Sequence, residues 1–293
     1  MDAHTAESPA DGPVVVGTDG SPDAVPAVKW AAREAAARSQ PLHIVHATGI
    51  DAWGGNLAPD TIRLVHDAAH LIVDEAAEHA RGQVPDLRVT TTVSGDRPDT
   101  SLLGTAGDTA TIVVGSRGLS GFPALLLGSV SLKVASHARG PVVVVRGTEQ
   151  PPRGVVLAGL RDERDLEVAR CAGRTAARRK AALHLVTAWT LPQYLESVAL
   201  IADEARARAG EQATAGAGGV VESVRREFPD VDISDEVKTE RSPANVLVEA
   251  SSHADLLVVG ARGPAHSIGA LMGRVTPAVL HHAHCPVAVI PRG

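Results

Sequence analysis

Aromatic side chains are scarce in this chain, where phenylalanine, tryptophan and tyrosine together make up 2% of 293 residues. Proteins that bind single-stranded nucleic acid without sequence preference stack the bases on such side chains. Positive charge is also in short supply, since the formal net charge is -6. A negatively charged protein is not drawn to nucleic acid or to an anionic membrane surface. We therefore expect neither of these partners.

Cysteine is nearly absent, because only Cys171 and Cys285 occur and they form no C-x-x-C pair. This pattern favours reduced thiols in a reducing compartment over a disulfide framework. Residues 1–13 lack the basic and apolar regions of a secretory signal. The longest stretch without charged residues or histidine, from Gly118 to Leu132, is interrupted by glycine, serine and proline, which is not typical of a membrane span. We expect a cytoplasmic protein with no membrane partner.

Catalytic motifs are missing as well. None of the four lysines follows a glycine, which excludes a Gly-x4-Gly-Lys-Ser/Thr loop, and neither Gly-x-Ser-x-Gly nor His-Glu-x-x-His occurs. Phosphoryl transfer would need a positioned base and metal ligands, and the sequence nominates no such set. His281, His282, His284 and Cys285 cluster near the C-terminus. They straddle a predicted helix end and strand start, so we expect no metal site there.

The chain repeats itself at about half its length. The run Leu42–Val45 recurs as Leu183–Val186, and Val113–Gly118 recurs as Val258–Gly263. The offsets are 141 and 145 residues, which indicates duplication of a whole domain and not a solenoid repeat. The predicted organisation is a flexible N-terminus over 1–12, a first domain over 13–147, a linker over 148–153 and a second domain over 154–293.

Within each copy, short β-branched runs alternate with alanine-rich stretches of helix length. Nearly all residues of these runs are apolar, as in strands buried on both faces of a parallel sheet. The predicted strands are 14–18, 42–47, 87–93, 111–114 and 141–146, then 154–158, 182–187, 232–237, 256–259 and 286–290. The fold class is α/β: two tandem five-stranded parallel-sheet sandwiches, Rossmann-like and adenine nucleotide alpha hydrolase-like.

Two helix boundaries can be predicted from local signals. Ser21-Pro22-Asp23 is typical of a helix start, with serine as the cap and proline in the first turn. The long helical region from Leu191 to Phe228 contains Gly216-Ala217-Gly218-Gly219. Glycine is a poor helix former, so we expect this helix to end or kink at the glycines.

The end of the fourth predicted strand carries the strongest candidate site. Gly115-Ser116-Arg117-Gly118 follows the strand directly, and Gly128-Ser129-Val130-Ser131 opens the next helix. Glycines let a backbone approach an anion, and a helix N-terminus adds partial positive charge. The hydroxyls of Ser129 and Ser131 can donate to phosphate oxygens. The arrangement predicts a phosphate-binding loop.

Asp19 ends the first predicted strand, and it lies beside the fourth strand if these two strands are neighbours. Its carboxylate could accept hydrogen bonds from a ribose or a base edge. It could equally shape the turn Asp19-Gly20-Ser21, because aspartate before glycine is common in turns. Both roles stay open from the sequence.

Two motifs of the first copy belong together: the run VVVGTDGS at residues 14–21, and the spacing Gly115-x2-Gly118-x9-Gly128-Ser129. With the repeat, they resemble the universal stress protein family in its tandem form, and the resemblance covers nearly the whole chain. The second spacing is similar to the ATP-binding signature of that family.

The resemblance implies ATP as the ligand, with or without Mg²⁺. It implies that Gly17, Thr18 and Asp19 hold the adenosine end and that Ala47 contacts adenine. The further residues implied in the first copy, around ribose and phosphates, are Val114, Gly115, Gly118, Gly128, Ser129, Val130 and Ser131.

The second copy departs from this pattern. Counting without gaps from the second-strand match aligns Asp19 with Leu160, which removes the carboxylate. Asp162 is close by, either as a substitute or only as a helix cap. The candidate residues here are Gly260, Gly263, Gly273, Arg274 in place of the serine, Val275, and Thr276 in place of Ser131. Whether ATP occupies this second site stays open.

The resemblance implies a regulator of stress adaptation, dormancy or growth, in which ATP is a bound signal more than a fuel. Members of the family dimerise through the last strand, so we expect a homo-oligomer and an unidentified regulatory protein partner. Two alternatives remain from the residues. The chain could be a nucleotide-independent dimeric interaction scaffold, or a slow ATPase.

Overall fold

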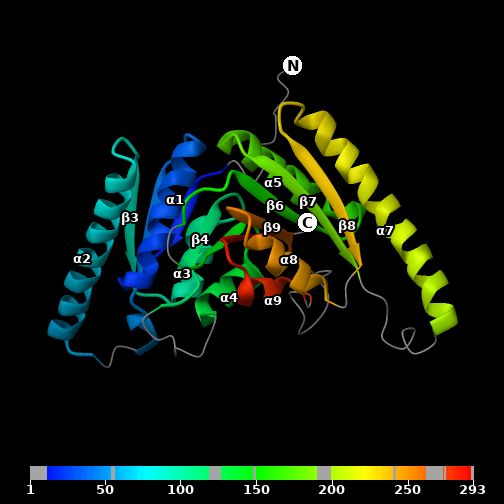
Figure 1. The fold of residues 1–293 in the computed structure, drawn as a ribbon. Helices are drawn as coiled ribbons and strands as arrows, with labels where there is room; N and C mark the ends of the chain where they lie inside the picture. Colours follow the sequence, from blue (N-terminus) through cyan, green and yellow to red (C-terminus); the bar gives the residue numbers. More distant parts are fainter. Residues whose placement is uncertain are drawn as a thin grey trace, which may run out of the picture. The chain divides into compact units, whose positions relative to one another are not determined.

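The computed structural model describes residues 12–53, 57–118, 127–147, 150–189, 199–239, 242–261, 273 and 275–291. The chain divides into two compact units, with the division between Glu149 and Gln150. Each unit has the alternating order of strands and helices that the sequence predicts (Figure 1).

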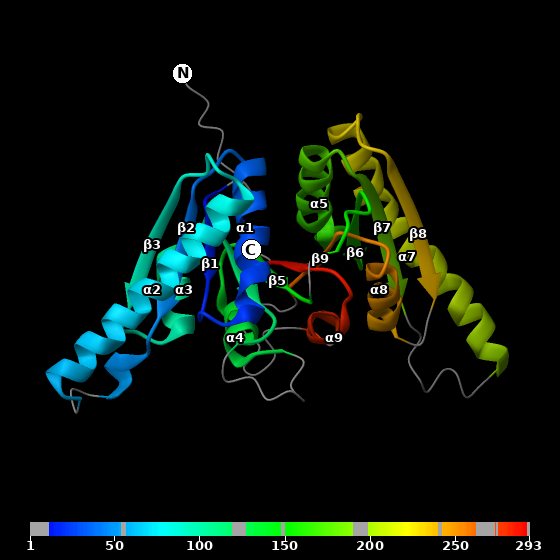
Figure 2. The ribbon, with the colours of Figure 1, turned by 60° about the vertical axis from the view of Figure 1, so that its left-hand side comes forward.

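A parallel sheet of five strands forms the centre of the first unit, in the order β3-β2-β1-β4-β5. The strands are β1 (Val14–Gly17), β2 (Leu42–Ala47), β3 (Val89–Ser94), β4 (Thr111–Gly115) and β5 (Val142–Val145). The helices are η2 (Pro22–Ala24), α1 (Val25–Ala37), η3 (Ile50–Trp53), α2 (Pro59–Gln83), α3 (Pro98–Ala106) and α4 (Ser129–His137). Helix α1 packs with α2, and α3 packs with α4 (Figure 2).

The second unit repeats this topology, with the parallel order β8-β7-β6-β9-β10. Its strands are β6 (Val155–Leu160), β7 (Ala182–Trp189), β8 (Ile233–Thr239), β9 (Leu256–Gly260) and β10 (Val287–Ile290). Its helices are η4 (Glu163–Asp165), α5 (Leu166–Arg179), α7 (Ala199–Glu227), α8 (Pro243–Ser251) and α9 (Val275–His282). The prediction of two tandem five-stranded parallel sheets is therefore confirmed.

The inner strands are buried as their apolar runs predict. Leu42, Ile44 and Ile112 are fully buried in the first unit, as are Leu157 and Leu183 in the second. Strand β3 differs, because its threonines at 90 and 91 are exposed. It is the edge strand of its sheet, where β-branched polar residues satisfy strand propensity without being buried.

Helix α7 contradicts the predicted break, because it runs continuously through the glycines at 216, 218 and 219. An added Cβ at any of the three would meet no atom within 4 Å, so these glycines serve no close approach. Buried Val220, Val221 and Val224 hold the same stretch against the sheet. Their burial contributes about 1.5–3 kcal/mol each, which outweighs a helix cost of about 1 kcal/mol per glycine.

The start of the first helix also differs from the prediction. The chain enters α1 through the 3-10 helix η2, and Ser21 makes no capping hydrogen bond with its side chain. Its hydroxyl donates instead to Asp19 Oδ1 at 2.6 Å. The serine therefore serves the turn that carries Asp19, while Pro22 occupies the first helical position as expected.

No helix in the described part of the chain is both long enough and apolar enough to cross a membrane.

Candidate functional site

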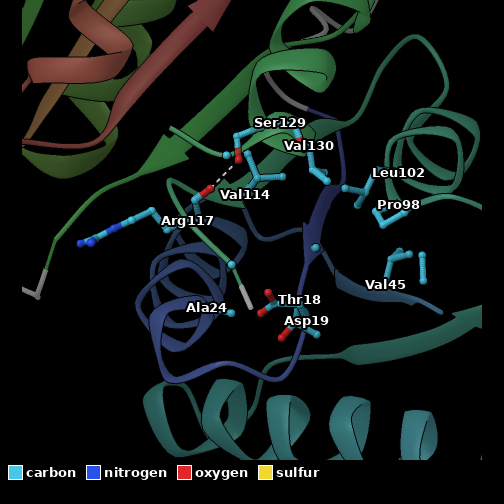
Figure 3. Close-up of a pocket in the computed structure, with 16 residues that line it drawn as sticks. Thr18, Asp19, Ala24, Val45, Pro98, Leu102, Val114, Arg117, Ser129 and Val130 are labelled. Atoms are coloured by element: carbon cyan, nitrogen blue, oxygen red, sulfur yellow. Dashed lines mark hydrogen bonds between the residues drawn. The ribbon is translucent and has the colours of Figure 1, made fainter. Parts of the chain in front are cut away.

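A cavity of about 300 Å³ opens at the carboxyl ends of the strands in the first unit. It lies where β1 neighbours β4 and the direction of winding reverses, which is the usual ligand position in open parallel sheets. The cavity is lined by Gly17, Thr18, Asp19, Ala24, Val45, Ala47, Pro98, Leu102, Val114, Gly115, Arg117, Gly118, Gly128, Ser129, Val130 and Ser131 (Figure 3). All eleven site residues that the sequence predicts for the first copy are in this set.

Asp19 performs the turn-shaping role that the sequence left open, and it also lines the cavity. Its Oδ1 accepts hydrogen bonds from the Ser21 N–H at 3.0 Å and the Ser21 hydroxyl at 2.6 Å. The turn is anchored to β2, because the Thr18 N–H donates to the Val45 carbonyl at 3.0 Å. His46 Nδ1 lies 2.9 Å from the Thr18 carbonyl, to which its N–H donates. The carboxylate is thus held in place before any ligand arrives.

The glycine loop approaches this carboxylate from β4. An added Cβ on Gly118 would lie 2.4 Å from Asp19 Oδ2, so no side chain fits there without movement. Backbone hydrogen bonds fix both ends of the loop: Ser116 N–H donates to the Val145 carbonyl, and Gly128 N–H donates to the Ser116 carbonyl. The loop and the Asp19 turn therefore form two walls of one cavity. Residues 119–126 of the loop lie outside the described part of the chain.

Helix α4 begins at Ser129, as predicted, and its start lines the cavity. Its N-cap is Gly128, and no side chain caps the first turn. The first N–H groups of a helix lack partners within the helix, so this end suits an anion. Ser129 is exposed and remains a candidate donor to phosphate.

Ser131 has a different role from the one the sequence suggests. Its side chain is buried, and its hydroxyl donates to the Gly115 carbonyl at 2.6 Å. A hydroxyl has one proton to donate, so this hydrogen bond prevents it from donating to a phosphate. Ser131 instead ties the start of α4 to the end of β4 and fixes the shape of the loop.

Five lining residues were not predicted: Ala24, Val45, Pro98, Leu102 and Arg117. Alanine, valine and leucine at these places look like ordinary core residues in the sequence, so nothing marked them. Arg117 stood inside the predicted loop, and its cationic side chain was the one available signal. In Figure 3 that side chain extends away from Thr18 and Asp19.

Positive charge gathers beside the loop. Arg146 follows the end of β5, which pairs with β4 so that Val145 is opposite Gly115. Burial lowers the pKa of the Arg146 guanidinium, and the nearby charge of Arg117 lowers it further. The two guanidinium groups are therefore close enough to interact, and Arg117 brings its positive charge to the cavity wall. The loop end of the cavity is thus suited to phosphate.

Gly17 in β1 lets the Leu102 side chain of α3 approach the strand closely. A Cβ there would lie 2.9 Å from Leu102 Cδ1, so its absence lets α3 pack at the cavity wall. The second unit repeats the contact, because a Cβ on Gly159 would lie 2.7 Å from Leu247 Cδ1. This pair makes Gly159 the counterpart of Gly17.

The strand register corrects the alignment of Asp19 with Leu160. In the first unit Gly17 pairs with Val45, and in the second unit Gly159 pairs with Val186. Leu160, which pairs with Thr187, is therefore the counterpart of Thr18, and Arg161 is the counterpart of Asp19. The second unit has exchanged an acid for a base at this position. Asp162 is a helix cap, since its side chain accepts from the Arg164 N–H.

The remaining candidates of the second unit are only partly described. Thr276 reproduces Ser131, since its hydroxyl donates to the Gly260 carbonyl at 3.0 Å. The threonine thus preserves the link between the fourth strand and the next helix, and Val275 begins that helix, α9. Gly263 and Arg274 lie outside the described residues, and Gly273 is the one described residue between positions 262 and 274.

The C-terminal histidine and cysteine cluster contains a buried thiol. Burial together with the Asp255 carboxylate raises the pKa of the Cys285 thiol to about 12. Among the described residues, no group of three or more histidine, cysteine or acidic side chains is placed to hold a metal ion.

The fold and the cavity define a class: a duplicated, Rossmann-like α/β protein with a ligand cavity at a strand switch point. The sequence profile of the universal stress protein family matches twice, over residues 12–146 and 153–291. The chain belongs to the universal stress protein family, as its motifs indicate.

Several relatives are matched over nearly their whole length. A universal stress protein of Mycobacterium tuberculosis is 32% identical over 291 residues, which cover 94% of this chain and 96% of the relative. Another from the same species is 31% identical over 287 residues, covering 94% and 95%. The crystal structure of a universal stress protein from Archaeoglobus fulgidus matches with a TM-score of 0.69 at 14% identity, covering 98% of each chain. The last likeness shows the shared fold.

Proposed function

We propose that the first domain binds ATP and that the bound nucleotide is a regulatory signal. The observation that carries the proposal is the pairing of Asp19 with the glycine loop across one cavity. Its volume of about 300 Å³ is at the lower end of ligand pockets, which span about 300–1,000 Å³. The Asp19 carboxylate at one wall can accept hydrogen bonds from ribose hydroxyls. The backbone N–H groups at the uncapped N-terminus of α4 can donate hydrogen bonds to phosphates.

The wall chemistry favours binding over catalysis. Among the described lining residues, Asp19 is the one carboxylate and Arg117 the one cation, and neither histidine nor lysine is present. Hydrolysis of ATP would need a base to orient water and ligands to hold Mg²⁺. Asp19 is already engaged by Ser21, so it is better suited to hold a ligand than to move a proton.

The proposal can be tested by calorimetric titration of nucleotide-free full-length protein with ATP, with GTP as the comparison. We expect saturable ATP binding, weaker GTP binding, and adenine nucleotide in the supernatant when freshly purified protein is denatured. The absence of both a binding isotherm and released nucleotide would contradict the proposal. That outcome would favour the nucleotide-independent scaffold.

A further inference from the structure

The second domain carries an ion cluster where the first domain presents Asp19. The Arg161 guanidinium Nε lies 3.0 Å from Asp162 Oδ2, and both side chains are 37% exposed. The Arg161 N–H donates to Asp165 Oδ2 at 2.9 Å. The backbone and the side chain of Arg161 are thus both held by neighbouring acids.

Asp165 adds a second difference at the same wall. It is the last residue of the 3-10 helix η4, as Ala24 is the last residue of η2 in the first domain. Ala24 lines the first cavity, whereas Asp165 is a carboxylate only 2% exposed. A small apolar wall residue has been replaced by a buried acid that is engaged with the turn backbone.

These exchanges remove the side-chain hydrogen-bond acceptors of Thr18 and Asp19 from their positions. The neighbouring acids Asp162 and Asp165 are engaged with Arg161. A guanidinium donates only, so Arg161 cannot accept a ribose hydroxyl as the Asp19 carboxylate can. Leu160, in place of Thr18, has no polar side-chain atom. Each ribose hydroxyl or base donor buried without an acceptor would weaken binding by about tenfold or more. The same position that favours adenosine in the first domain therefore opposes it in the second.

We propose that Arg161 excludes nucleosides from the second domain, so that each chain binds one nucleotide, in the first domain. The inference rests on the proposed ATP binding by the first domain. The charge at one position of the duplicated fold thus determines specificity: Asp19 favours nucleoside binding in the first domain, and Arg161 prevents it in the second.

Equilibrium dialysis with radiolabelled ATP at saturating concentration measures the number of nucleotides per chain. We expect one for the natural chain and none for Asp19→Arg, which gives the first domain the charge of the second. Asp86→Arg is the matched control, because Asp86 is exposed before the amino end of β3, away from the cavity. This control should still bind one nucleotide.

Two nucleotides per natural chain would overturn the inference while leaving the proposed function intact. One nucleotide retained by Asp19→Arg would also overturn it, since the site would then be elsewhere. No nucleotide on the natural chain would contradict the proposed function itself. Circular dichroism checks the fold, and Asp19→Asn, which keeps an acceptor for Ser21, provides a milder variant that should lose at least about tenfold in affinity, or about 1.4 kcal/mol.

Discussion

Replacing Gly118 by alanine is expected to weaken ATP binding by about tenfold or more, which corresponds to about 1.4 kcal/mol, without unfolding the first domain. The added methyl would lie 2.4 Å from Asp19 Oδ2, well inside van der Waals contact. The carboxylate or the loop must therefore move, and either movement separates the two walls that face the ligand. Calorimetric titration of the Gly118→Ala protein with ATP measures the loss directly.

Gly104→Ala is the matched control for this change. Gly104 lies in α3, and an added Cβ there would meet no atom within 4 Å. This variant should keep the natural affinity for ATP and gain slightly in stability, by about 0.5–1 kcal/mol, because alanine is the better helix former. If Gly118→Ala binds ATP as tightly as Gly104→Ala does, the site is not the one described.

Removing the Glu34 carboxylate should destabilise the first domain by about 3–5 kcal/mol. Glu34 Oε1 lies 2.8 Å from both Nε and Nη2 of Arg38, and the two side chains are 2% and 6% exposed. Arg38 Nη1 also donates to the fully buried Thr111 hydroxyl at 2.8 Å. In the Glu34→Ala protein the buried guanidinium would lose its charged partner, which is the costly way to break such a pair.

Urea unfolding measures this loss, with tryptophan fluorescence recorded in a Trp189→Phe background, so that the remaining tryptophans, Trp30 and Trp53, both report on the first domain. The surface change Asp108→Ala in the same domain serves as the control. Asp108 pairs with Arg139, but its side chain is 65% exposed, so water replaces the interaction and the cost is about 1 kcal/mol or less. A Glu34→Ala protein as stable as this control would show that the buried pair contributes little.

The strands and the glycine loop followed from local patterns, whereas other wall residues such as Gly17 and Ala47 followed from the family resemblance. Apolar β-branched runs predicted all ten strands, and glycines at the end of β4 predicted the loop. The parallel arrangement then required the Asp19 turn and this loop to share one edge of the sheet. What the patterns missed were apolar wall residues such as Val45 and Leu102, whose role depends on tertiary packing and not on residue type.

The alignment of the two copies failed for a physical reason. From Gly17 to the start of η2 at Pro22 the chain advances five positions, whereas from the equivalent Gly159 to the start of η4 at Glu163 it advances four. A count made from the second strand crosses this segment and shifts the first strand by one position, so Leu160 took the place of Arg161. Only the pairing of neighbouring strands reveals the correct register. The predicted break in α7 was wrong because burial of one face of the helix outweighs the low helix propensity of its glycines.

The two copies of the domain differ in charge at one equivalent position, Asp19 in the first and Arg161 in the second. The two domains share a fold, the Gly17 close approach and the hydroxyl link made by Ser131 and Thr276. They differ where a nucleoside would be recognised. One domain thus carries the residues of the proposed nucleotide site, while the other shares the architecture and has the opposite charge at the position of Asp19.

Hydrogen–deuterium exchange with and without saturating ATP tests whether the first-domain cavity is the nucleotide site. We expect slower exchange in peptides that cover residues 14–21, 45–48, 111–118 and 127–131, and unchanged exchange over residues 155–165 of the second domain. Unchanged exchange throughout the first-domain segments, or protection confined to the second domain, would contradict this expectation.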